Sequence, residues 1–134
     1  MQLNTTSQPH RRAWLVLGWG MVLSVFVLSL IPLDVDLSHD RDKVAHAFAY
    51  AAMTFWFAML FRGWARQLGV ALAFAAMGVA IEYLQRMTGY RTFDVADMIA
   101  NGIGAALGFG LVQTPLGRAL DWTERLLARL ARKP

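Results

Sequence analysis

Side chains that could do chemistry recur at helical spacing near residue 45. Asp42, His46 and Tyr50 are four residues apart, and Lys43 lies beside the first of them. On a helix that begins by residue 42, the four-residue spacing places Asp42, His46 and Tyr50 in one stripe. A histidine next to a carboxylate can act as a general base, or it can be a satisfied hydrogen-bonded pair.

Two further groups of polar residues follow the same rule. Glu82 and Gln85 are three residues apart, and Arg91 lies six residues later. The last group recurs at intervals of three, four, three and four, which is one helix face: Asp94, Asp97, Asn101, Gly104 and Gly108. This face is polar at its start and glycine-lined below. We expect Gly104 and Gly108 to serve close packing of another helix.

The residues between these groups predict a membrane protein. Hydrophobic residues make up 57% of the chain and charged residues 16%, against roughly 45–50% and about 25% in a typical soluble domain. The apolar runs are continuous rather than alternating, which favours helices. We therefore predict an all-α fold with four transmembrane helices plus a C-terminal basic amphipathic helix. The spans are expected at residues 13–31, 44–61, 68–84 and 95–112.

The basic residues predict the orientation of these spans. Of the 13 Lys and Arg residues, nine lie in the segments before residue 13, between the second and third spans, and after residue 112; four lie in the other two loops. By the positive-inside rule both termini are cytoplasmic and loops 32–43 and 85–94 face outward. The net charge of +4 thus indicates orientation rather than nucleic-acid binding. The length of the first span favours an uncleaved anchor over a secretory signal.

Three regions follow: a cytoplasmic tail (residues 1–12), a four-helix membrane domain (13–112) and a C-terminal amphipathic helix (113–134). Thr114 as N-cap and Pro115 at the first helical position predict where this last helix begins. Its arginines and leucines occupy different faces, so it can lie on the anionic inner leaflet or remain a solvated tail.

The polar residues of the spans are all expected at the outward end. A charge at membrane depth costs roughly 2.5–3.5 kcal/mol, so these side chains should face one another. We expect the basic groups Lys43, Arg91 and His46 to pair with Asp42, Glu82, Asp94 and Asp97.

Three blocks of the sequence, in order, resemble the VanZ-like family of small bacterial membrane proteins. They are Asp42-Lys43-x-x-His46-x-x-x-Tyr50, Glu82-x-x-Gln85, and Arg91 followed by Asp94-x-x-Asp97-x-x-x-Asn101-x-x-Gly104. The resemblance covers residues 15–112 and implies a location in the bacterial cytoplasmic membrane and a cell-envelope role. The family is named after a protein linked to resistance against teicoplanin, a glycopeptide antibiotic. It implies no settled chemical activity.

Three functions fit the polar layer. A binding protein would use Lys43 and Arg91 on the phosphate of a lipid-linked envelope precursor, or engage the lipid-like part of a glycopeptide, with Asn101 on uncharged groups. An intramembrane hydrolase of a lipid-linked substrate would use His46 as general base, or His46, Glu82 and Asp97 as ligands of a divalent metal. A structural or partner-binding protein would use the layer as an ion-pair network.

The sequence favours the binding protein over the hydrolase. It contains no HExxH motif, no GxSxG motif and no cysteine, so the common metalloprotease and nucleophile signatures are missing. We therefore assign no catalytic residue, no metal site and no cofactor. The expected partners are the lipid bilayer, an envelope precursor or glycopeptide, and anionic lipid at the C-terminal helix.

Overall fold

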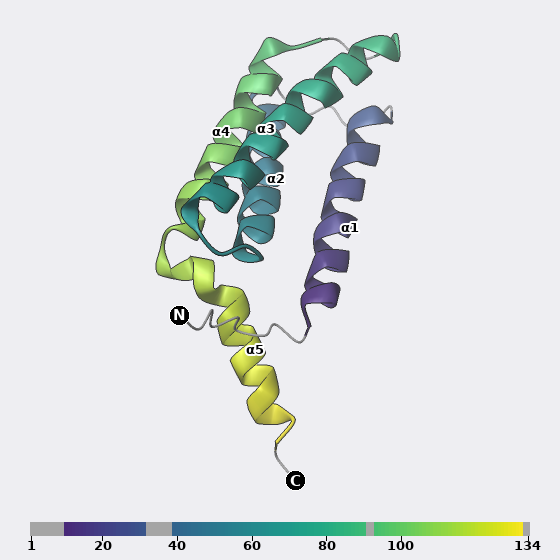
Figure 1. The fold of residues 1–134 in the computed structure, drawn as a ribbon. Helices are drawn as coiled ribbons and strands as arrows, with labels where there is room; N and C mark the ends of the chain where they lie inside the picture. The colour runs from purple at the N-terminus through teal and green to yellow at the C-terminus, as the bar shows by residue number, and fades with distance from the viewer. Residues whose placement is uncertain (1–9, 32–38, 91–92, 133–134) are drawn as a thin grey trace.

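The computed structural model describes residues 10–31, 39–90 and 93–132, and every regular element within them is helical. Four long helices form a bundle, and a fifth follows after a short 3-10 turn (Figure 1). The elements are α1 (Arg11–Leu30), α2 (His39–Met59), α3 (Trp64–Met87), α4 (Val95–Val112), η1 (Pro115–Arg118) and α5 (Ala119–Leu130). The all-helical prediction is confirmed.

The long helices run alternately up and down, so the start of α2, the end of α3 and the start of α4 meet at one end of the bundle (Figure 1). Local signals fix these ends. Gly89 follows α3 with a φ of 77°, which a residue with a side chain rarely adopts. Asp94 caps α4, since its side chain accepts a hydrogen bond from Ala96 N. We call this the cluster end; the start of α1 and the helix α5 lie toward the other end (Figure 1).

Helices α2 and α4 are packed backbone to backbone. A Cβ atom added at Gly104 would overlap the carbonyl of Ala47, and one at Gly108 would overlap the carbonyl of Ala51. Only glycine permits this approach, as is usual for small residues between membrane helices. The close pair brings the polar residues of α2 and α4 within reach of each other. The glycine face expected from the sequence is therefore located at this interface.

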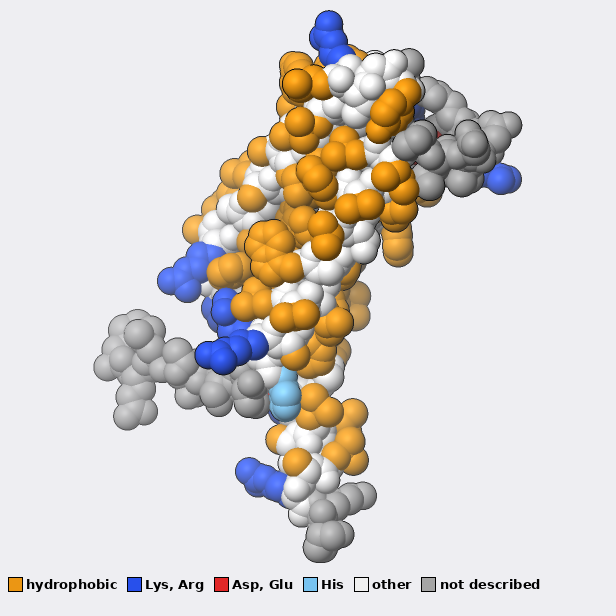
Figure 2. All heavy atoms as spheres, turned by 90° about the vertical axis from the view of Figure 1, so that its right-hand side faces the viewer, with side chains coloured by type: hydrophobic (Ala, Val, Ile, Leu, Met, Phe, Trp, Pro, Cys, Tyr) orange, Lys and Arg blue, Asp and Glu red, His pale blue; other side chains and the backbone are white. Residues whose placement is uncertain are grey.

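Three helices, α1, α3 and α4, are long and apolar enough to cross a membrane, so the chain is a multi-pass membrane protein. Figure 2 shows one face of the molecule, where apolar side chains cover the bundle and Lys and Arg side chains gather toward its ends. The remaining predicted span, residues 44–61, falls on α2, which carries polar residues at its start and buries Tyr50, Met53 and Ala58 in the core. A helix enclosed by its neighbours needs less lipid-facing apolar surface. Its membrane crossing stays a prediction.

The C-terminal helix is fastened to α1 by one carboxylate. Thr114 and Pro115 begin a helical turn as predicted, but this turn is the 3-10 helix η1, and the α-helix itself begins only at Ala119. On α5, Glu124 accepts hydrogen bonds from His10 Nδ1 and Trp14 Nε1, both at 2.7 Å. Burial raises the pKa of Glu124, but these hydrogen bonds outweigh that effect and hold the pKa below its usual value of 4.5. The apolar residues Trp122, Leu126 and Leu130 remain exposed.

Candidate functional site

A polar cluster lies at the cluster end between α2 and the start of α4. The ammonium group of Lys43 donates hydrogen bonds to Asp94 Oδ2 at 2.9 Å and to Asp97 Oδ1 at 3.1 Å. All three side chains are between 14% and 30% exposed, so the ion pairs are partly shielded from solvent. Pairing of the lysine with carboxylates is expected, because an unpaired charge within a membrane is energetically costly.

The imidazole of His46 lies one turn further along α2. Its Nδ1 donates to Asn101 Oδ1 at 3.0 Å, and its Nε2 faces Asp42 Oδ1 at 3.9 Å. Asn101 is 2% exposed and reaches this position because α3 has glycine opposite it. A Cβ atom at Gly78 would come within 2.8 Å of Asn101 Cβ. The asparagine is thus a buried partner that orients the histidine.

The carboxylate of Glu82 closes the cluster from α3. It is 1% exposed, and its Oε1 accepts a hydrogen bond from the backbone N–H of Asp94, just before α4. Within the described part of the chain its second oxygen, Oε2, has no hydrogen-bond partner, and the hydroxyls of Tyr50 and Thr54 have none either. Such unpartnered buried oxygens are uncommon in native proteins and each calls for a physical reason.

Two other predicted site residues, Gln85 and Tyr50, are buried and take no part in the hydrogen bonds of this cluster. Gln85 is 3% exposed and donates to the backbone carbonyl of Ser29 at 2.8 Å, so it ties α3 to α1 rather than joining the cluster. Tyr50 is buried in the hydrophobic core below His46. Arg91 lies outside the described residues. We define the polar cluster as Asp42, Lys43, His46, Glu82, Asp94, Asp97 and Asn101.

Sequence reasoning missed two contributors. Gly78 admits Asn101, and Thr54 places a buried hydroxyl beside Gly108. Gly78 follows Ala71 and Phe74 at intervals of three and four residues on the buried face of α3, which is the signal that would have identified it. Thr54 is one turn beyond Tyr50 and extends the polar stripe of α2.

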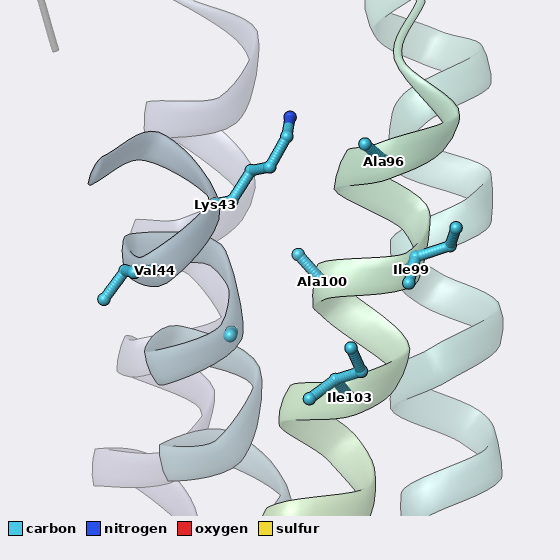
Figure 3. A pocket seen from close by; sticks show the side chains of 7 residues that line it. Lys43, Val44, Ala96, Ile99, Ala100 and Ile103 are labelled. Atoms are coloured by element: carbon cyan, nitrogen blue, oxygen red, sulfur yellow. The ribbon is translucent and has the colours of Figure 1, made fainter. Parts of the chain in front are cut away.

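An apolar groove opens directly below Lys43, between α2 and α4 (Figure 3). Its volume is about 340 Å³. Val44, Ile99 and Ile103 are more than half exposed, so the groove lies on the outer surface of the bundle. We name it the α2–α4 groove; it is lined by Lys43, Val44, Ala47, Ala96, Ile99, Ala100 and Ile103.

The fold and the site together define the class of this protein, which is a small helical membrane bundle with a polar cluster at one end. Comparison with known families is specific: the chain belongs to the VanZ/LLP1 family, whose sequence model matches residues 6–116. That match includes all of the polar cluster and extends into η1.

One curated relative is the uncharacterized protein C11E3.10 of Schizosaccharomyces pombe, which is 33% identical over 98 residues. The alignment covers 64% of this chain and 59% of the yeast protein, so the chain spans less than two thirds of that relative's length. No solved structure matches the chain.

Proposed function

We propose that this protein binds a lipid-linked precursor of the cell envelope, with the polar head at the polar cluster and the hydrocarbon chain in the α2–α4 groove. One observation carries the proposal: Lys43 belongs to both places. Its stem lines the groove, while its ammonium is held by Asp94 and Asp97. A lysine that lies along apolar surface with its charge at the polar end is suited to an amphipathic ligand.

The groove supports a hydrocarbon occupant. Its lining apart from Lys43 is alanine, valine and isoleucine. The groove runs along α4, which is long and apolar enough to cross a membrane. A volume of about 340 Å³ is at the lower end of ligand pockets, which measure roughly 300–1,000 Å³. It therefore accommodates part of one lipid chain beside the helices rather than a whole ligand.

The polar cluster supports a head group with both acidic and hydroxyl or amine groups. The ammonium of Lys43 suits a phosphate oxygen, and the carboxylates of Asp42 and Asp97 accept hydrogen bonds from hydroxyl or amine groups. Asn101 and Glu82 are too buried to touch a ligand, so they would position the other residues instead. Fewer side chains are thus available to contact a head group than the sequence predicted.

Retained lipids test the proposal. The protein is purified from membranes into nanodiscs, and the lipids that remain bound are identified by mass spectrometry. Ala96→Phe should fill the groove and deplete the retained lipid, whereas Leu107→Phe adds the same ring to α4 outside the groove and should not. Lys43→Met should also deplete it. Retained lipids that match the bulk membrane in every variant would refute the proposal.

The same experiment separates the other readings. If the polar cluster only holds the helices in register, Lys43→Met lowers thermal stability but leaves the retained lipids unchanged. If the occupant is a lipid-bearing glycopeptide, added teicoplanin binds the unmodified chain but does not bind the Ala96→Phe variant, whose groove is filled. Neither result is expected when the ligand is an envelope lipid already present in the membrane.

A further inference from the structure

The geometry points to a divalent metal site formed by Asp42, His46 and Asp97, a site that does not depend on the proposed lipid. One ligand atom from each residue lies within 4.8 Å of the other two. Bonds from zinc to nitrogen and oxygen are about 2.0–2.2 Å and the geometry is tetrahedral, so two ligand atoms of one ion lie about 3.3–3.6 Å apart. Small side-chain rotations, easiest for the exposed Asp42, bring the three atoms onto one ion.

The hydrogen bonds leave three electron-pair donors facing one another. Because His46 Nδ1 is engaged with Asn101 Oδ1, Nε2 is the ring nitrogen that is left for a metal ion. That atom faces Asp42 Oδ1 at 3.9 Å, which is too long for a hydrogen bond. A cation between them removes the mutual repulsion of lone pairs and carboxylates. Metal-binding histidines commonly donate their other N–H in this way, which fixes ring orientation.

Glu82 provides a second, independent observation at this site: a buried oxygen without a hydrogen-bond partner among the described residues. Its side chain is 1% exposed, and Oε2 has no hydrogen-bond partner among the described residues. Its other oxygen, Oε1, accepts a hydrogen bond from the backbone N–H of Asp94, three residues before Asp97, so the side chain lies next to the proposed site. A buried carboxylate oxygen without a donor is costly unless a cation lies nearby. An ion held by His46 and Asp97 supplies that cation.

The ligand set selects the kind of ion. One imidazole with carboxylates suits Zn²⁺ or Mn²⁺ rather than Cu⁺, which prefers thiolate and thioether ligands. The side chain of Asp42 is 41% exposed, so an ion can reach the site from outside the bundle. The ammonium of Lys43 is also close to the site, because it contacts Asp97 Oδ1. If the proposed function holds, the ion adds positive charge for a phosphate of the head group.

Metal titration tests the site. Chelator-treated protein in detergent is titrated with ZnCl₂ or MnCl₂ by calorimetry, and one ion per chain is expected. His46→Ala and Asp97→Asn should each weaken binding at least tenfold, and Asn101→Ala should weaken it by about 10–100-fold, as loss of an orienting partner does. His10→Ala and Asp121→Asn are matched controls, because those residues pair with Glu124 and Arg62 far from the cluster. Equal weakening in the controls overturns the site.

A spectroscopic measurement covers the case in which a variant fails to fold. Pulsed electron paramagnetic resonance of Mn²⁺ bound to the unmodified chain should show coupling to a histidine nitrogen. Stoichiometric Mn²⁺ without nitrogen coupling, or no bound Mn²⁺ and Zn²⁺ at all, overturns the proposal. The lipid experiment is read separately: a lipid retained by metal-free protein would sustain the proposed function while the metal site fails.

Discussion

Replacing Gly104 by alanine tests whether the close approach of α2 and α4 assembles the polar cluster. The added methyl group would meet the backbone carbonyl of Ala47, which cannot rotate away as a side chain can. The two helices must therefore separate. Overpacking of this kind costs about 1–3 kcal/mol, and the better helix propensity of alanine returns about 0.5–1 kcal/mol. We expect a net loss of stability of up to about 2.5 kcal/mol.

Gly102 provides a matched control in the same helix. A Cβ atom there has no neighbour within 4 Å, so Gly102→Ala should gain the propensity without the overlap. The difference in unfolding free energy between the two variants isolates the cost of overpacking, which is about 1–3 kcal/mol. This corresponds to a change of about fivefold to more than a hundredfold in the unfolding equilibrium constant. Unfolding by SDS in mixed micelles, followed by circular dichroism, measures both. Equal stability of the two variants would refute close packing at Gly104.

Three further predictions concern other contacts. Gly78→Ala should displace Asn101, and nitrogen NMR should then show altered His46 tautomer populations; an unchanged spectrum would contradict the contact. Because the folded-state pKa of Glu124 is lowered, its carboxylate stabilises the docking of α5 above about pH 4.5, and that stability is lost as the pH falls through the folded-state value. Distances between spin labels on α1 and α5 should increase at low pH but be insensitive to pH in Glu124→Gln. In this cysteine-free chain, Met87→Cys should react with an impermeant maleimide on intact cells and Gln113→Cys only after permeabilisation; the reverse would overturn the predicted orientation.

The helices were predictable because long apolar runs in a membrane have few alternatives. The last span was expected at residues 95–112, and α4 covers the same residues. The second was expected from residue 44, whereas α2 already begins at His39. Hydropathy identifies the part of a helix suited to lipid, not the polar turn that extends beyond it. The charged residues 40–43 therefore belong to the helix although they lower its hydropathy.

Which side chains meet could be predicted only in part. Spacing along one helix identifies a face, but the rotation of each helix about its own axis is set by packing. Asp94 and Asp97 were expected near Lys43, and the structure places them there. Gln85 shares a face of α3 with Glu82, yet it turns to the carbonyl of Ser29 on α1. No pattern within a single helix contains that information.

A comparison of Gln85 with the polar cluster favours a role for the cluster beyond a structural network. A neutral amide is enough to tie α3 to α1 at the same end of the bundle. If helix register were the only requirement, an amide could replace the carboxylate of Asp97 on the apolar helix α4 and avoid roughly 2.5–3.5 kcal/mol for a charge at membrane depth. The chain instead keeps this carboxylate beside Asp42, His46 and a buried Glu82 oxygen. An excess of acceptors at such a cost favours a site built to receive a cation or a cationic group.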